Sequence, residues 1–177
     1  MAIRTIREQD GKARPGLTSE QVWQAVARAS FAVLSHVTPA GEPRSSGVVY
    51  KTIGRRLVVA VAPDSWKAQQ VAADGRVAVT VPVRRGGILS LVAPIPPATV
   101  SFHGTAVVYP AGSPQARSVL NDVGSLIPAE RRTSACVIEI TPAGAFRTYG
   151  LGVSLRAMLD PAAAQARVPV TPGKGAR

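Results

Sequence analysis

The sequence predicts a mainly β fold: an antiparallel β-barrel of six or seven strands in Greek-key order, with an N-terminal helix and a few further short helices. Short runs rich in valine and isoleucine recur along the chain, and tight turn signals built on glycine, proline and aspartate separate them. Helical periodicity is confined to short stretches. At 177 residues with 46% hydrophobic content, the chain is long enough for one core and too short for two.

The chain divides into three parts by composition. Residues 1–16 form a polar lead-in, and residues 17–150 carry the predicted barrel. Residues 151–177 form a tail with a candidate short helix over 160–166, and its final Pro/Gly/Lys segment is expected to be disordered.

The first elements follow from a capping signal and a change of period. Thr18 precedes Gln21 by three residues, which is the spacing of a capping box, and apolar residues then recur at helical intervals. We therefore predict an amphipathic helix over 19–30. Residues 31–37 are predicted to form a strand, and the Thr-Pro-Ala-Gly sequence at 38–41 is typical of a type I turn.

The stretch 41–82 is the most informative part of the chain. It contains two β-branched runs, 48–51 and 57–62, joined by a glycine turn. A Pro-Asp-Ser break then begins a helix at Trp66, and an Asp-Gly pair returns the chain to a strand over 77–81.

The later elements are predicted in the same way. We expect a long strand over 100–109 and a helix over 113–123 with Ser-Pro at its start. Two strands should follow, 135–140 and 145–148, joined by a second Thr-Pro-Ala-Gly turn at 141–144.

The segment 84–98 is a long connection between two predicted strands. One interpretation is a lid over a bound cofactor, with a Gly-Gly hinge and a proline-stiffened far side. The alternatives are an apolar flap that packs against a partner subunit, or a loop that contacts a membrane.

Charge and composition argue against several classes of partner. The formal net charge is +11, but the basic residues are scattered and only 5% of residues are aromatic, so we expect no nucleic-acid partner. The longest apolar run is interrupted by prolines and too short to span a bilayer, and the N-terminus lacks a signal-peptide core. We therefore expect a cytoplasmic protein with no membrane partner.

Side chains for metal or acid–base chemistry are sparse. Cys136 is the only cysteine and lies in an apolar run, where a buried structural role is expected. His36 and His103 each stand alone in a predicted strand without a carboxylate at metal-ligand spacing, so no metal site is predicted. The acidic residues are scattered, and we nominate no catalytic side chain.

One short motif does indicate a binding site. Ser65-Trp66-Lys67 begins a helix directly after a strand. The N–H groups and the dipole of a helix N-terminus attract an anion, and a hydroxyl and an ammonium add charge-assisted hydrogen bonds. The motif therefore predicts a phosphate site; the alternative is a solvated lysine.

Together these features resemble the pyridoxamine phosphate oxidase-like split-barrel flavoproteins over residues 32–148. The resemblance rests on the order and spacing of several short motifs rather than on any one of them. In chain order they are Gly41-Glu42-Pro43, Lys51, Ser65-Trp66-Lys67, Asp74-Gly75-Arg76-Val77 and Gly104-Thr105-Ala106.

The resemblance implies a phosphate site with two departures from the family pattern. In the family, the residues equivalent to Ser65 and Lys67 bind the ribityl phosphate of FMN. Trp66 stands where an arginine is frequent, and Ser46 where many members have a phosphate-binding arginine. Each departure removes a bidentate phosphate donor.

The resemblance also places residues near the flavin ring. It implies that Lys51 lies close to the flavin and that backbone groups of Ala60 and Val61 face the isoalloxazine. Thr99 matches a position that often supplies a polar group from a second subunit. The family shape further implies a homodimer with its cofactor sites at the interface.

The function implied is that of an oxidoreductase that uses FMN, or the deazaflavin coenzyme F-420, to reduce a planar conjugated small molecule. The alternative is a flavin- or haem-binding carrier or sensor of the same fold, which the two lost arginines favour. Oxidation of pyridoxamine phosphate depends in the family on a C-terminal Arg-x-His element. No histidine follows Phe146, so the sequence argues against that activity.

Overall fold

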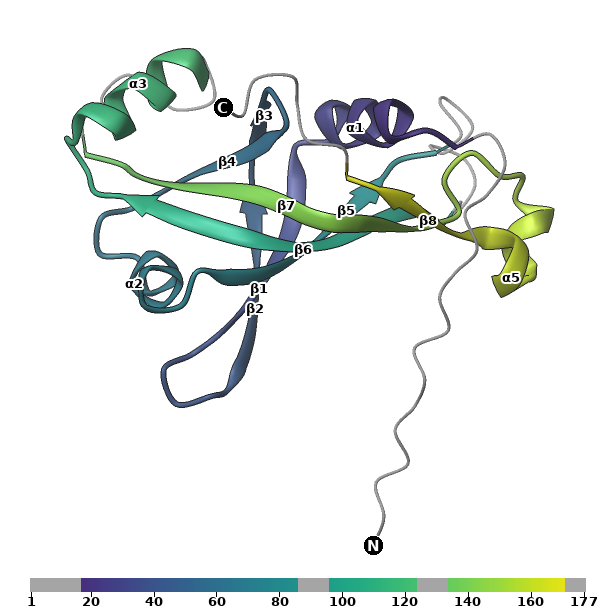
Figure 1. The fold of residues 1–177 in the computed structure, drawn as a ribbon, viewed down its shortest axis with the longest axis horizontal. Coiled ribbons are helices and arrows are strands. Elements are labelled where there is room, and N and C mark those ends of the chain that lie inside the picture. Colours follow the sequence, from purple (N-terminus) through teal and green to yellow (C-terminus); the bar gives the residue numbers. More distant parts are fainter. Residues whose placement is uncertain (1–16, 86–95, 124–133, 171–177) are drawn as a thin grey trace, which may run out of the picture.

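The structure is a computed structural model that describes residues 17–85, 96–123 and 134–170. In these residues the chain forms one antiparallel sheet that curls into a half-barrel, with helices packed at its ends and edges (Figure 1). This confirms the predicted mainly β fold. The lead-in 1–16 and most of the 84–98 connection lie outside the described residues.

The strand order of the sheet is β2-β1-β5-β6-β7-β4-β3, with β8 paired to β7. The two end strands, β2 and β3, follow each other directly in the sequence but lie at opposite edges of the sheet. The strands are β1 Phe31–Val37, β2 Pro43–Val49, β3 Lys51–Ile53, β4 Arg56–Val61, β5 Arg76–Val83, β6 Ala98–Tyr109, β7 Cys136–Tyr149 and β8 Gln165–Pro169. The helices are α1 Ser19–Arg28, α2 Trp66–Ala73, α3 Pro114–Val123, η3 Arg156–Leu159 and α5 Pro161–Ala164.

The predicted capping box starts α1. The Thr18 hydroxyl accepts from the backbone N–H of Gln21 at 3.3 Å, and Gln21 Oε1 accepts from the Thr18 N–H at 2.9 Å. The helix buries Val22, Trp23 and Val26 in the main core. It ends at Arg28, two residues before the predicted end, because Ala29 is already extended.

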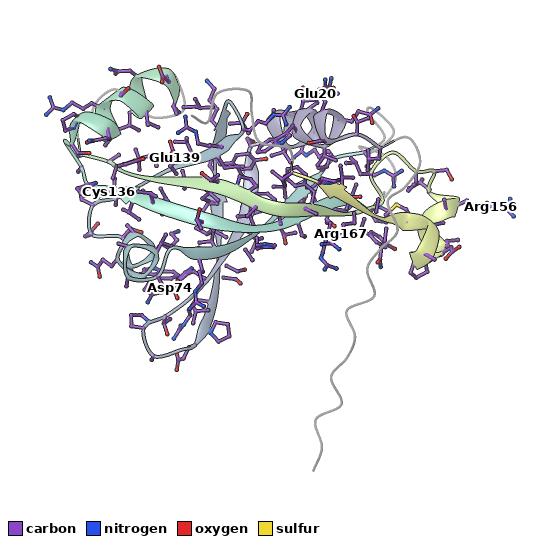
Figure 2. All side chains as sticks on the ribbon, viewed as in Figure 1. Glu20, Asp74, Cys136, Glu139, Arg156 and Arg167 are labelled. Atoms are coloured by element: carbon purple, nitrogen blue, oxygen red, sulfur yellow. The ribbon has the colours of Figure 1, made fainter. Side chains whose placement is uncertain are left out.

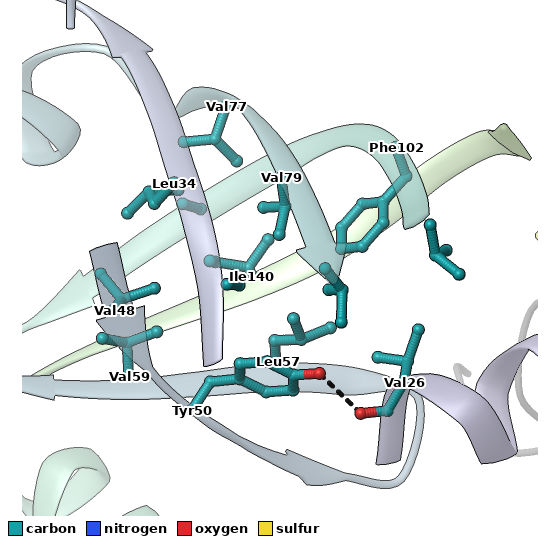
Figure 3. Close-up of a cluster of buried hydrophobic side chains, with 14 of the residues drawn as sticks. Val26, Leu34, Val48, Tyr50, Leu57, Val59, Val77, Val79, Phe102 and Ile140 are labelled. Atoms are coloured by element: carbon teal, nitrogen blue, oxygen red, sulfur yellow. Dashed lines mark hydrogen bonds between the residues drawn. The ribbon is translucent and has the colours of Figure 1, made fainter. Parts of the chain in front are cut away.

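The β1–β2 hairpin turns where the sequence predicts. The Gly41 N–H donates to the Thr38 carbonyl at 2.8 Å, and Gly41 has a φ of +84°, which glycine adopts without strain. The strand pairing then breaks at Tyr50, whose buried hydroxyl donates to the Val26 carbonyl at 2.6 Å (Figure 3). Burial raises the pKa of Tyr50 above its usual range. This break lets one run of chain pair first with β1 and then with β4.

The prediction of two strands joined by a turn at 141–144 is wrong. Residues 136–149 form the single strand β7, and its Thr-Pro-Ala-Gly stretch lies beyond the end of β4 and before the start of β8. The pairing of β7 with β6 shifts register between Ser101 and His103, and this shift accommodates the stretch without ending the strand. Gly144 has a φ of +68°, and Gly104 lets the strands approach, since a Cβ there would lie 2.3 Å from the Thr141 oxygen. The long partner β6 therefore overrides the local turn signal.

Two apolar clusters flank β4. Leu57 and Val59 face the main core inside the half-barrel (Figure 3), while Val58 packs in a second cluster beneath α3. In the main core, Phe146 makes edge-to-face contacts with Trp23 and Phe102, with ring centroids 5.2 and 5.6 Å apart. A strand buried on both faces fixes the start of α2 rigidly.

The C-terminal part extends the sheet, which the sequence analysis did not predict. The candidate helix over 160–166 is shorter, Pro161–Ala164, and Asp160 caps it by accepting from the Ala162 N–H at 2.9 Å. Residues 165–169 instead pair with β7 as β8. No helix in the described parts of the chain is long and apolar enough to cross a membrane.

Candidate functional site

The start of α2 has the features of an anion site. The Ser65 N–H donates to the Ala62 carbonyl at 3.0 Å in the turn after β4, which sets Ser65 as the N-cap of α2. The Ser65 hydroxyl makes no capping hydrogen bond, and the first turn of α2 contains no acidic residue. The first N–H groups of a helix have no partner within it. The hydroxyl, the N–H groups and the helix dipole therefore all favour an anion, and the carboxylate nearest in sequence is Asp64, just before the N-cap.

Lys67 and Trp66 complete this helix start. The Lys67 ammonium lies 5.8 Å from the centroid of the Trp66 indole. The indole is 46% exposed, and its other contact is with the His36 imidazole, at a centroid distance of 5.6 Å. The Trp66 ring thus lies against β1 and still offers apolar surface beside the lysine.

His36 links this helix to the inside of the half-barrel. It is buried, and its Nε2 lies 2.7 Å from Gln70 Oε1 on α2. Because an amide oxygen only accepts, Nε2 is the donor in this hydrogen bond. Sequence reasoning treated His36 as an isolated strand residue; its contacts are with residues more than 25 positions away, so no local signal could reveal them.

Two buried polar atoms on β1 and β2 have no hydrogen-bond partner among the described residues. They are His36 Nδ1 and Ser46 Oγ. On the β1–β2 ladder, His36 lies opposite Arg44 and Ser46 lies opposite Leu34, so all four side chains share the concave face. Buried polar atoms are rarely left unpaired. This end of the hairpin therefore has capacity for a further polar ligand atom.

Lys51 lies beside the end of α3, and its place near the flavin, which the resemblance implies, stays a prediction. Its ammonium donates to the Val123 carbonyl, the last residue of α3, at 3.0 Å. A cation at a helix C-terminus is stabilising. Lys51 lies opposite Val58, which packs beneath α3, so Lys51 is on the α3 side of the sheet.

The predicted ring-facing residues of β4 divide between two faces. Val61 packs against the main core, whereas Ala60 packs against the cluster beneath α3. Their side chains therefore point to opposite sides of the strand, as alternation requires. A ligand beside β4 could contact the backbone of both Ala60 and Val61, but the side chain of only one of them.

Thr99 is not brought to the α2 site within one chain. Gly75, just after α2, accepts from the Ala106 N–H at 2.7 Å, which fixes the end of α2 on β6. Thr99 is seven residues further along that strand, a distance of about 23 Å at 3.3 Å per residue. A role for Thr99 beside the same cofactor requires a second copy of the chain and stays a prediction.

The Asp-Gly-Arg-Val motif after α2 is a local clamp. Arg76 donates to both carboxylate oxygens of Asp74, with an Nη2–Oδ2 distance of 2.6 Å. The hydrogen bonds from Arg76 lower the pKa of Asp74 to about 2. This pair closes the C-terminal end of α2, and Asp74 lies eight residues after Trp66, the first residue of the helix.

The family of the chain follows from a comparison with family models. Residues 18–148 match the family model for pyridoxamine 5'-phosphate oxidase, which spans α1 to β7 and all eight predicted site residues. The chain belongs to this family. No curated protein sequence is significantly similar to the chain.

Solved structures share the pyridoxamine 5'-phosphate oxidase fold with this chain at low identity. A haem-binding protein from Mycobacterium smegmatis is 22% identical, with a TM-score of 0.61 over 87% of this chain and 63% of that one. HutZ, the haem storage protein from Vibrio cholerae, is 13% identical, with a TM-score of 0.60 over 77% and 98%. An FAD-binding protein from Mesorhizobium loti is 18% identical, with a TM-score of 0.52 over 71% and 90%. These likenesses establish the fold.

Two further expectations from the sequence concern Cys136 and metal binding. Cys136 is buried, as expected from its apolar surroundings. Within the described residues, no group of three histidine, cysteine, aspartate or glutamate side chains could hold a metal ion.

Proposed function

We propose that this member of the pyridoxamine 5'-phosphate oxidase family is an oxidoreductase that uses FMN or a deazaflavin to reduce a planar conjugated small molecule. One observation carries the proposal: the start of α2 combines Lys67, a Ser65 hydroxyl that makes no capping hydrogen bond, and a first turn without an acidic residue. This donor set fits the phosphate group that both cofactors carry.

The residues around this site would hold and orient the cofactor. Ser65 and Lys67 bind its phosphate, and the exposed part of the Trp66 indole packs on an aromatic or ribityl portion. The bound cofactor supplies the hydride or electron transfer. The protein side chains contribute position, local charge and exclusion of water, and no acid–base side chain is required of them.

A homodimer is part of this proposal. Thr99 lies seven residues from Ala106, which holds the end of α2 on β6, so in this proposal a second copy supplies it. Phe31 and Val49, paired across β1 and β2 and exposed by 46% and 56%, provide apolar surface on the outer face of the sheet for such a contact.

A second candidate function is ligand carriage or sensing without turnover. Ser46 and Trp66 replace two arginine donors, and Lys51 is engaged by the end of α3. Proteins of the same fold include one named for haem binding and one named for haem storage. These observations favour weaker binding of the cofactor phosphate and a ligand other than FMN.

Ligand titration followed by a turnover assay separates the two functions. The purified protein is titrated with FMN, the deazaflavin coenzyme and haem, with cofactor fluorescence or haem absorbance as the readout. The loaded protein is then reduced chemically without oxygen and mixed with quinones or tetrapyrroles. The oxidoreductase proposal predicts that the protein accelerates reoxidation of a bound flavin or deazaflavin. Tight binding with no acceleration for any acceptor favours the carrier.

A further inference from the structure

The side chains at the start of α2 include one cation and one anion. Asp64, Ser65, Trp66 and Lys67 follow one another after β4, and Lys67 is half-buried while Asp64 is exposed. The formal charges of Asp64 and Lys67 sum to zero. The helix N-terminus adds the equivalent of about half a positive charge. The electrostatics of this segment therefore suit an anion of low charge.

The charge of Asp64 is not balanced by an ion pair. Asp64 makes no salt bridge with the described residues. Asp74, at the opposite end of α2 (Figure 2), is by contrast paired with Arg76. An acidic group just before a helix interacts favourably with the helix N-terminus. Asp64 therefore competes with a bound anion for that N-terminus and repels it, and the repulsion grows with the charge of the anion.

Trp66 adds no charged donor to this segment. Its indole lies 5.8 Å from the Lys67 ammonium and 5.6 Å from the centroid of the His36 ring. An indole has one neutral N–H, whereas an arginine at this position would bring a positive charge and paired donors. The face of the indole also attracts the Lys67 ammonium. The lysine charge is therefore shared between the ring and any bound anion.

The arginine of the neighbouring hairpin is engaged as well. Arg44 lies opposite His36, the residue that contacts Trp66. Its guanidinium donates to the Glu42 carboxylate at 3.0 Å. This end of the hairpin therefore contributes an ion pair rather than an unbalanced cation.

The phosphate groups of the two candidate cofactors differ in charge. A phosphomonoester, as in FMN, carries about −1.5 to −2 at neutral pH, because its second ionisation has a pKa of about 6. The deazaflavin coenzyme carries its phosphate as a diester, which has one negative charge and no second ionisation. Lys67 alone can balance a diester. A dianion next to Asp64 would be left partly uncompensated.

We propose that the start of α2 selects a phosphodiester over a terminal phosphomonoester, and that Asp64 and Trp66 set this preference. The ligand class is a flavin or deazaflavin whose phosphate carries a second ester arm. The preference rests on the proposed function, because it concerns the same phosphate site.

A matched pair of ligands tests the preference: FMN and the monomethyl ester of its phosphate, which share the ring and the ribityl chain. Each is titrated into the full chain between about pH 5 and pH 8, with quenching of flavin fluorescence as the readout. At the upper end FMN should bind about two- to fivefold more weakly than the ester. Its affinity should rise as the pH falls and its phosphate takes up a proton. The ester lacks that ionisation, so its affinity reports any titration of Asp64, His36 or Glu42.

Two substitutions should remove the preference. Trp66→Arg supplies a charged fork and should tighten FMN binding about tenfold or more, and ester binding less. Asp64→Asn removes the repulsion and should tighten FMN binding about two- to fivefold. Two controls should leave the ratio of the FMN and ester affinities unchanged. Trp66→Phe keeps an aromatic ring without a charge, and Gln24→Arg adds the same charge at an exposed position of α1.

The outcomes distinguish the preference from the proposed function. Tighter binding of FMN than of its ester by wild type at about pH 8 would overturn the phosphodiester preference and leave flavin binding in place. An unchanged ratio of the two affinities in folded Trp66→Arg and Asp64→Asn would do the same. If wild type binds neither FMN, nor its ester, nor the deazaflavin coenzyme, the proposed function itself is overturned, and the preference with it.

Discussion

The Trp66 indole contacts the buried His36 imidazole at a ring-centroid distance of 5.6 Å and an interplanar angle of 41°. His36 is itself held to α2 through Gln70. The residue that departs from the family's arginine is therefore not a loose surface side chain. It is a platform whose position is set by β1, directly beside the lysine proposed to hold a phosphate.

Replacing His36 with alanine should loosen this platform. The change leaves the Gln70 amide without its partner and opens space beneath the indole, so we expect a loss of about 1–3 kcal/mol in unfolding free energy. Urea unfolding measures this loss. In a Trp23→Phe background, the fluorescence of Trp66 should shift to longer wavelength. An unchanged spectrum would show that the ring contact does not hold Trp66 in place.

Replacing Lys51 with alanine should act mainly on stability. The ammonium interacts with the C-terminal carbonyl of α3, and a cation in that position contributes about 0.3–1 kcal/mol. We expect a loss of that size in urea unfolding and a smaller loss of cofactor affinity than Lys67→Ala causes. If Lys51→Ala leaves stability unchanged and abolishes cofactor binding, Lys51 faces the cofactor rather than α3.

The Asp74–Arg76 clamp should be visible in acid. Arg76 lowers the pKa of Asp74 to about 2 from the ordinary 3.8, so the folded state binds this proton less readily than the unfolded state. The stabilisation is fully present above pH 4 and is lost as the pH falls towards 2. The stability difference between wild type and Asp74→Asn should shrink over that range in urea unfolding at pH 5, 3 and 2. Asp64→Asn, a change at another exposed carboxylate, is the control.

Replacing Gly104 with alanine should disrupt the irregular part of β7. A Cβ at this position would lie 2.3 Å from the Thr141 oxygen, a backbone atom that cannot move without shifting the strand. We expect a loss of about 1–3 kcal/mol, the usual cost of overpacking. Gly47→Ala is the matched comparison, because its Cβ would meet only the edge of the Phe31 ring. Equal, small losses in the two variants would contradict the close approach of β6 and β7.

The sequence predicted correctly those elements that depend on interactions between residues close together in the chain. The capping box of Thr18 and Gln21 and the turn that ends at Gly41 both depend on residues within four positions. The same four-letter sequence at 141–144 does not end the strand, because β6 pairs with β7 on both sides of a register shift. The strand β8 could not be predicted either, since its existence depends on a free edge of β7.

The residues of the candidate site also divide into those that the sequence predicts from neighbouring positions and those that only the folded sheet brings together. Ser65 and Lys67 could be found from spacing, because a helix start after a strand is a local feature. The Lys51 contact with Val123 spans 72 residues and the His36 contact with Gln70 spans 34. Contacts at such separations are set by the curl of the sheet, which no short pattern contains.

The central claim is tested most directly by the affinity of Lys67→Ala for the cofactor. FMN and the deazaflavin coenzyme are each titrated into wild type, Lys67→Ala, Lys67→Arg and Gln69→Ala, with quenching of cofactor fluorescence as the readout. Gln69 is exposed on the same helix and serves as the control. The predicted result is a loss of about 1.5–3 kcal/mol in Lys67→Ala, the range for a hydrogen bond to a charged group, with partial recovery in Lys67→Arg and no loss in Gln69→Ala. Equal affinity of Lys67→Ala and wild type for the bound cofactor, or no binding of either cofactor by wild type, would contradict the account.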